Sequence, residues 1–136
     1  MSSTTSNVKI RILVVDDEPD ILLAISSVLE RRGHYVKTFD NPRSALEHLT
    51  NQVAQYDVVI TDYRMPGGIS GLDIAKTAKK EARKTKVFLM TAFDISTLPE
   101  VSEMLKSEIV DKILQKPIPN DKLIAVIEKS FLHNNH

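Results

Sequence analysis

The stretch Ile10-Arg11-Ile12-Leu13-Val14-Val15 is followed directly by two acids, Asp16 and Asp17. A short, nearly continuous apolar run of this kind is typical of a strand that is buried on both faces of a sheet. A second such run, 58–61, is followed by a third acid, Asp62. If the two strands lie side by side and parallel, the three carboxylates open into one crevice. We then expect the function of the chain to depend on that crevice.

The rest of the chain alternates between apolar runs and helical spacing. Further strands are predicted at 35–39, 87–90 and 109–114. Between the strands, apolar residues recur at helical intervals, with Pro19 near the first helix start and Gly33 at its stop. Five strand–helix repeats with short links predict a doubly wound parallel α/β sheet with helices on both faces.

Capping residues predict three other helix starts. Asn41 precedes a proline and is expected to cap the second helix. Thr97 and Glu100 stand three residues apart, which is typical of a capping box, and Asn120 is expected to cap the last helix. These signals place each expected helix after its strand.

The composition describes one ordinary globular domain without a charge bias. The chain has 136 residues, 42% of them hydrophobic and 26% charged, and its 18 basic and 18 acidic residues cancel. Nothing in this balance predicts binding of nucleic acid or an anionic membrane, and the basic stretch 78–86 is interpreted as a solvated helix end. The chain lacks cysteine, which excludes disulfides and thiolate sites. We expect a disordered tail over 1–8, a folded domain over 9–132, a short tail over 133–136 and a cytoplasmic location.

The polar residues that follow the strands meet at one edge of such a sheet. In open α/β sheets the ligand crevice lies outside the carboxyl ends of the strands. Asp16, Asp17 and Asp62 stand there, together with Thr91 after the fourth strand and Lys116 after the fifth. Each has an ordinary explanation alone: an acid can cap a helix, a threonine can end a strand, and a lysine can be a solvated charge. Their conjunction predicts a phosphoryl-transfer site, because clustered carboxylates need a hard cation such as Mg²⁺, and a hydroxyl and an ammonium can hold phosphoryl oxygens.

Four motifs give the chain a resemblance to a known family. They are Leu13-Val14-Val15-Asp16-Asp17-Glu18-Pro19, Asp62-Tyr63-Arg64-Met65-Pro66 with Gly71-Leu72, Met90-Thr91-Ala92, and Lys116-Pro117. Over residues 9–132 the chain resembles the receiver domain of two-component response regulators. The resemblance implies a flavodoxin-like sheet of strand order 2-1-3-4-5 with five helices, and a cis Lys116-Pro117 peptide.

The resemblance also assigns roles to the site residues. It implies that Asp62 is the phosphoacceptor and that Thr91 and Lys116 hold the phosphoryl oxygens. It implies Mg²⁺ (or Mn²⁺) bound by Asp17, Asp62 and the backbone carbonyl of Arg64, with Asp16 acting through a water molecule. Such a domain is a switch and not an enzyme, apart from catalysing its own phosphorylation and dephosphorylation.

Partners follow from the same resemblance. The phosphoryl donor would be a sensor histidine kinase or a phosphotransfer protein. The response would alter the surface formed by the fourth helix, fifth strand and fifth helix, which controls binding to an unknown downstream protein target. Neither direct nucleic-acid binding nor membrane binding is expected, and the chain would be a monomer or a phosphorylation-dependent dimer.

Three positions depart from the family pattern. Ile113 stands where the family has an aromatic residue that swings inward on activation, and Ile109-Val110 replaces a common Gly-Ala pair. The stretch 66–71 is one residue longer than usual, and its pair Gly67-Gly68 can absorb the extra residue at low steric cost. These departures concern the output and leave the acceptor chemistry intact.

Two residues beside the site are predicted to affect its lifetime. Arg64 and Phe93 lie two residues beyond Asp62 and Thr91, in positions that flank the path of attacking water in the family. A long cation and a large ring there would slow dephosphorylation.

Two other functions remain open. An aspartyl phosphatase could use a similar sheet, but such enzymes place Asp-x-Asp after the first strand, and this chain has adjacent Asp16-Asp17. A receiver-shaped protein-binding module that signals without phosphate is the other alternative, and Ile113 motivates it.

Overall fold

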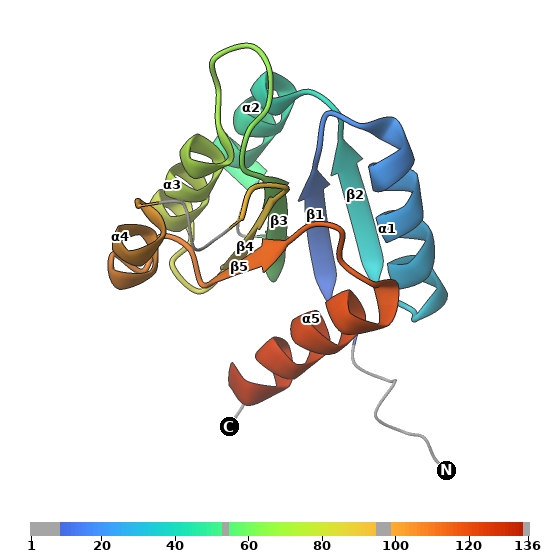
Figure 1. Cartoon of the computed structure of the whole chain (residues 1–136). Helices are drawn as coiled ribbons and strands as arrows, with labels where there is room; N and C mark the ends of the chain where they lie inside the picture. Colours follow the sequence, from blue (N-terminus) through green and yellow to red (C-terminus); the bar gives the residue numbers. More distant parts are fainter. Residues whose placement is uncertain (1–8, 53–54, 95–98, 135–136) are drawn as a thin grey trace.

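The computed structural model describes residues 9–52, 55–94 and 99–134, which form five strands that alternate with five helices (Figure 1). The strands are β1 (Arg11–Val15), β2 (Tyr35–Phe39), β3 (Val58–Asp62), β4 (Lys86–Thr91) and β5 (Lys112–Gln115). The helices are α1 (Pro19–Arg31), α2 (Pro42–Gln52), α3 (Gly71–Glu81), α4 (Val101–Lys106) and α5 (Asn120–Asn134). All strand pairs are parallel and the order is β2-β1-β3-β4-β5, which confirms the expected doubly wound sheet.

Helices cover both faces of the sheet (Figure 1). The side chains of α2, α3 and α4 pack on one face in a cluster that includes Leu49, Ile74 and Met104. Those of α1 and α5 pack on the other, around Leu29 and Ile127. Because β1, β3 and β4 are buried on both faces, they show the continuous apolar runs seen in the sequence.

The fifth strand is shorter than predicted. It begins at Lys112, whereas the apolar run suggested a start at residue 109. Glu108 has a left-handed backbone (φ 64°), and Val110 is buried as part of the link that leads into the strand. The run was therefore apolar because this link packs against the core, a cause that periodicity does not distinguish from a strand.

Capping predictions had mixed outcomes. Asn41 Oδ1 accepts hydrogen bonds from the amides of Arg43 and Ser44, as expected of a helix cap. Thr97 lies outside the described residues, and α5 starts at Asn120 itself. The sequence interpretation missed the capping box of α3, in which Ser70 Oγ accepts from the Asp73 amide and the Asp73 carboxylate accepts from the Ser70 amide. None of the helices in the described residues has both the length and the apolar character that a membrane span needs.

Candidate functional site

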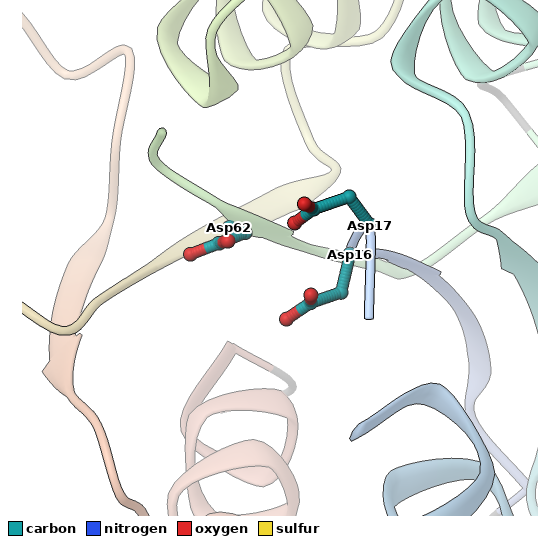
Figure 2. A group of neighbouring side chains, drawn as sticks. All are labelled: Asp16, Asp17 and Asp62. Atoms are coloured by element: carbon teal, nitrogen blue, oxygen red, sulfur yellow. The ribbon is translucent and has the colours of Figure 1, made fainter. Parts of the chain in front are cut away.

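The parallel register of the two central strands brings the three acids together. Val15 is paired with Thr61, so Asp16, which follows β1, and Asp62, the last residue of β3, lie side by side at the carboxyl edge of the sheet. Figure 2 shows Asp16, Asp17 and Asp62 turned toward a common space. One carboxylate oxygen from each lies within 4.8 Å of the others. The three carboxylates that the strand ends were expected to bring together therefore lie close together in the structure.

Negative charge exceeds positive charge in this crevice. Asp16 is fully buried, Asp62 is 7% exposed and Asp17 is half-buried. Lys116 Nζ lies 2.8 Å from Asp16 Oδ2 and 3.4 Å from Asp62 Oδ1. Within the described residues, one ammonium therefore pairs with two of the three clustered carboxylates, and buried charges are stable only where they are paired.

This surplus changes the acidity of the central carboxyl group. Burial, together with the negative charges of Asp16 and Asp17, raises the pKa of Asp62 to about 6 against the opposing effect of Lys116. Burial lowers the pKa of Lys116, but its hydrogen bond and charge interaction with Asp16 and Asp62 outweigh that effect and leave the pKa raised. The ionised form of Asp62 is therefore destabilised by its surroundings, and a further cation would stabilise it.

The free oxygen atoms suit a hard divalent cation. Asp16 Oδ1 accepts the Glu18 amide at 2.9 Å and Oδ2 accepts Lys116, so both of its oxygens already have protein partners. Glu18 is the residue that precedes α1, so the helix-capping explanation accounts at most for Asp16 and leaves Asp17 and Asp62 unexplained. An all-oxygen donor set with surplus negative charge fits Mg²⁺, which takes one or two carboxylates and retains several waters.

Thr91 and Lys116 lie beside the acids, as predicted. Thr91 is buried at the end of β4, and its Oγ1 accepts the Phe93 amide at 3.0 Å, which leaves the hydroxyl hydrogen able to donate. The Lys116 amide donates to the Thr91 carbonyl at 2.7 Å and so holds the ends of β4 and β5 together. The Lys116-Pro117 peptide is cis, which confirms that prediction.

Glycines determine the backbone path of the loop that follows Asp62. A Cβ atom on Gly71 would lie 2.2 Å from the backbone oxygen of Asp62, so no larger residue fits without movement of the chain. Gly67 and Gly68 have φ values of 96° and 84°, a region that glycine adopts without steric cost. The pair therefore accommodates the longer loop as expected.

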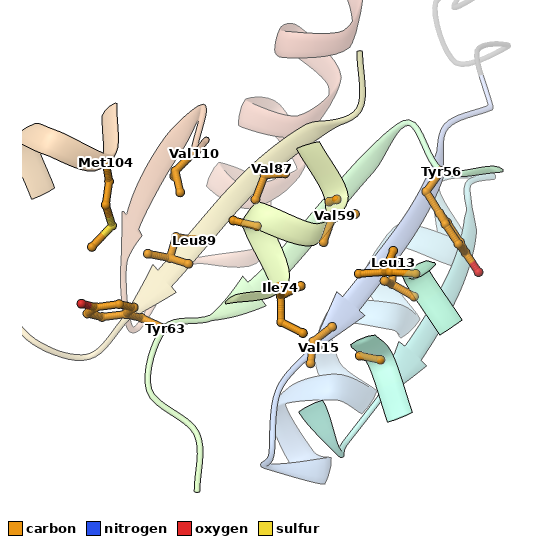
Figure 3. Close-up of a cluster of buried hydrophobic side chains, with 14 residues drawn as sticks. Leu13, Val15, Tyr56, Val59, Tyr63, Ile74, Val87, Leu89, Met104 and Val110 are labelled. Atoms are coloured by element: carbon orange, nitrogen blue, oxygen red, sulfur yellow. The ribbon is translucent and has the colours of Figure 1, made fainter. Parts of the chain in front are cut away.

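Tyr63 was not singled out from the sequence, yet it contacts both Asp62 and the residue that precedes a distant helix. Its amide donates to the Met90 carbonyl at 2.7 Å and to Asp62 Oδ1 at 3.1 Å. Its hydroxyl donates to Glu100, the residue that precedes α4, so Glu100 does not cap that helix with its side chain. Burial and the Glu100 hydrogen bond raise the pKa of Tyr63 to about 12. Figure 3 shows its ring near Met104, in the cluster against which Ile113 also packs.

Arg64 and Phe93 form a stack at the rim of the crevice. The guanidinium carbon of Arg64 lies 4.7 Å from the centre of the Phe93 ring and 5.4 Å from that of Tyr63. Phe93 is 49% exposed, an unusual position for a large apolar ring unless a neighbour covers one of its faces. The two residues predicted to flank the site are therefore in contact with each other.

The comparisons with known proteins agree with this geometry. A family model described as the response regulator receiver domain matches residues 12–128. The response regulator receiver protein CpdR of Brucella abortus is 30% identical over 122 residues, which cover 90% of this chain and 97% of that protein. The transcriptional regulatory protein ZraR of Escherichia coli is 32% identical over 126 residues, which cover 93% of this chain and 27% of ZraR.

Among solved structures, the response regulator protein TrrA of Thermotoga maritima, in complex with Mg²⁺ and BeF, is 35% identical with a TM-score of 0.72. The alignment covers 90% of this chain and 98% of TrrA. The chain thus spans almost all of CpdR and TrrA but only about a quarter of ZraR. By its family match and by its sheet order, the chain belongs to the response regulator receiver domains, the signalling switches of two-component systems.

Proposed function

We propose that Asp62 accepts a phosphoryl group from a phosphohistidine donor and that this modification switches the chain between two binding states. The observation that carries the proposal is the charge surplus of the crevice, where Asp16, Asp17 and Asp62 meet a single ammonium. Phosphoryl transfer needs positioning and charge neutralisation more than covalent assistance, and this crevice offers both.

A divalent cation completes the proposed site. Asp17, Asp62 and the Arg64 carbonyl would hold Mg²⁺ (or Mn²⁺), and Asp16 would act through water because its own oxygens already bond Glu18 and Lys116. The bound cation supplies neutralisation of the negative charge that gathers on the phosphoryl oxygens. The TrrA complex with Mg²⁺ and BeF supports this assignment by similarity.

The transfer step uses groups that are already in place. A carboxylate oxygen of Asp62 forms the new P–O bond while the P–N bond to the donor imidazole breaks, and the imidazole leaves with the bonding electron pair. The Thr91 hydroxyl would donate to one phosphoryl oxygen, and Lys116 would move from the carboxylates toward another. Dephosphorylation would break the same P–O bond: water attacks phosphorus, the Asp62 carboxylate leaves with the bonding electron pair, and inorganic phosphate is released.

The proposed partners are a sensor histidine kinase or a phosphotransfer protein upstream and a protein target downstream. Tyr63 offers a physical route for the output, because its amide bonds Asp62 and its hydroxyl bonds Glu100 at the start of α4. A phosphoryl group on Asp62 would disturb the first bond and shift the second. This route would complement Ile113, which has no hydroxyl and lies half-buried in the same cluster.

Intact-mass measurement after incubation with acetyl phosphate and Mg²⁺ tests the proposal. The wild type should gain one phosphoryl mass, and Asp62→Asn should gain none. Asp40→Asn, which removes an exposed acid outside the crevice, is the matched control and should be modified like the wild type.

The same experiment separates the other two functions. No mass gain from acetyl phosphate or from a phosphorylated histidine donor would favour a binding module that signals without phosphate. Repeated turnover of p-nitrophenyl phosphate that requires Asp62 would favour a phosphatase.

A further inference from the structure

Positive charge is concentrated in one segment of a chain that is neutral overall. Residues 76–86 contain six basic side chains and one acid, Glu81. They cover the carboxyl end of α3 and the link into β4. A net charge of zero thus conceals a local excess at this place.

Ion pairs and contacts at the end of α3 account for only some of these basic side chains. Lys79 Nζ donates to the Thr85 carbonyl at 2.7 Å and pairs with Asp111 at 2.8 Å, which stabilises the end of α3. Lys86 lies 3.9 Å from the same carboxylate, and Arg11 pairs with Asp57 at 3.1 Å.

Four cations of this segment remain without such a role. Within the described part of the chain, Lys76, Lys80, Arg83 and Lys84 are exposed and lie within ion-pair distance of none of the carboxylates. A helix dipole favours one or two cations and not this number. Their concentration therefore calls for another explanation.

These cations line a groove and do not stand on a convex surface. The groove has a volume of about 1450 Å³, and its lining includes seven Lys and Arg side chains and three carboxylates. The opposite side is formed by the link between α4 and β5, which contributes Ser107, Glu108 and Ile109. Small-molecule pockets typically measure about 300–1,000 Å³, so this groove is better matched to a segment of a polymer.

The groove lies at the opposite edge of the sheet from the acceptor. Its lining residues Arg11 and Lys86 begin β1 and β4, and Asp57 and Asp111 directly precede β3 and β5. Because the strands are parallel, their amino ends are one strand length away from Asp62. An occupant of the groove would leave the phosphorylation crevice open.

We propose that this groove binds an acidic segment of a partner polypeptide. The unpaired cations would pair with its carboxylates, and the half-buried side chains of Ala82 and Ile109 offer apolar contact between them. A nucleic-acid strand fits less well. Of the two aromatic side chains in the lining, Tyr56 is buried and Phe131 is partly buried against the core, and Asp57, Glu108 and Asp111 repel a phosphate backbone.

Fluorescence anisotropy with a labelled peptide that alternates glutamate and leucine tests the proposal on the full chain. The triple variant Lys80→Glu, Arg83→Glu, Lys84→Glu should weaken binding by about tenfold or more, since each exposed pair contributes a few tenths to about 1 kcal/mol. A matched triple, Lys37→Glu, Arg43→Glu, Lys122→Glu, changes the net charge equally at exposed positions outside the lining and should leave binding within about twofold. Glu108→Gln should tighten binding, because it removes an acid from the lining.

Each other outcome would overturn the proposal. Equal weakening by both triples would show that only net charge matters. Tighter binding of single-stranded or duplex DNA than of the peptide would make the groove a nucleic-acid site. Absence of peptide binding at about 50 mM salt would show a solvated surface. A glutamine version of the triple removes the same charges without reversing them, and it controls for misfolding of the glutamate variant. Phosphorylation of Asp62 should be unchanged in all variants, which separates this test from that of the proposed function.

Discussion

The crevice around Asp62 and the cluster around Glu128 both contain carboxylates that are half-buried or buried, at opposite edges of the sheet, but they differ in the balance of charge. In the crevice, Asp16 and Asp62 share Lys116, and Asp17 lies beside them. In the other cluster, the single carboxylate of Glu128 accepts hydrogen bonds from Arg32 at 2.6 and 3.0 Å and from His34 at 2.7 Å. The first has unsatisfied negative charge, and the second has partners for each of its oxygens.

The His34 ring shows how complete the second cluster is. Its Nδ1 accepts the Ile10 amide at 3.1 Å, so the ring hydrogen must lie on Nε2, which donates to Glu128. These bonds tie α5 to the end of α1 and the start of β1. The comparison indicates that balanced buried charge fixes structure, whereas a surplus of one sign marks a place for a ligand.

The largest expected effect comes from opening the balanced cluster. His34→Ala removes the acceptor of the Ile10 amide and one donor to Glu128, and it leaves a cavity, so we expect a loss of about 3 kcal/mol in unfolding free energy. Arg32→Ala removes a guanidinium at the exposed edge of the same cluster and should cost much less. Urea denaturation measures both, and equal losses would contradict the different roles assigned to the two residues.

The surplus cluster should respond in the opposite direction. Asp62→Asn removes a carboxylate whose pKa is raised to about 6, so at pH 7 without metal it should stabilise the fold by about 2 kcal/mol. Urea denaturation in the presence of a chelator measures this gain.

Magnesium provides the control for that substitution. Mg²⁺ should stabilise the wild type in proportion to the logarithm of its concentration and should have much less effect on Asp62→Asn. If Asp62→Asn instead lowers the free energy of unfolding, the ionised carboxylate of Asp62 does not destabilise the fold.

The fold and the residues that form the crevice could be predicted from the sequence. Buried parallel strands leave continuous apolar runs, and a residue that directly follows such a run must lie at the carboxyl edge of the sheet. Asp16, Asp62 and Thr91 were located in this way, because each is adjacent to its strand in the chain. The role of each in phosphoryl transfer came from the resemblance and stays a prediction.

Contacts between distant segments could not be predicted. Tyr63 and Glu100 are 37 positions apart, and His34 and Glu128 are 94 apart, so no periodicity relates them. His34 is buried for its hydrogen bonds, and only the packing of α5 on α1 reveals that.

The two clusters should also differ in their dependence on pH. The pKa of Asp62 is raised, so its contribution to stability is present below its ordinary value of 3.8 and is lost as pH rises through about 6. The pKa of Glu128 is lowered, chiefly by the Arg32 hydrogen bond, so its contribution is present above 4.5 and is lost as pH falls. Between pH 5 and pH 7 the metal-free wild type should therefore lose about 1 kcal/mol relative to Asp62→Asn. Denaturation curves across this range measure the difference, and a flat difference would contradict the raised pKa.

The smallest expected effect concerns the rim of the crevice. Arg64 and Phe93, two residues beyond Asp62 and Thr91, contact each other, and an exposed contact between a cation and a ring contributes about 0.5–1 kcal/mol. Arg64→Ala or Phe93→Ala should therefore accelerate loss of the phosphoryl group by about threefold, because water would reach the acceptor more easily. Intact-mass time courses after removal of acetyl phosphate measure the half-life. Lys37→Ala removes the other exposed cation that lies over a ring, that of Phe39, and should leave the half-life unchanged. If both rim variants decay at the wild-type rate, the stack shields nothing, and the lifetime of the phosphorylated state is set by the carboxylates and Lys116 alone.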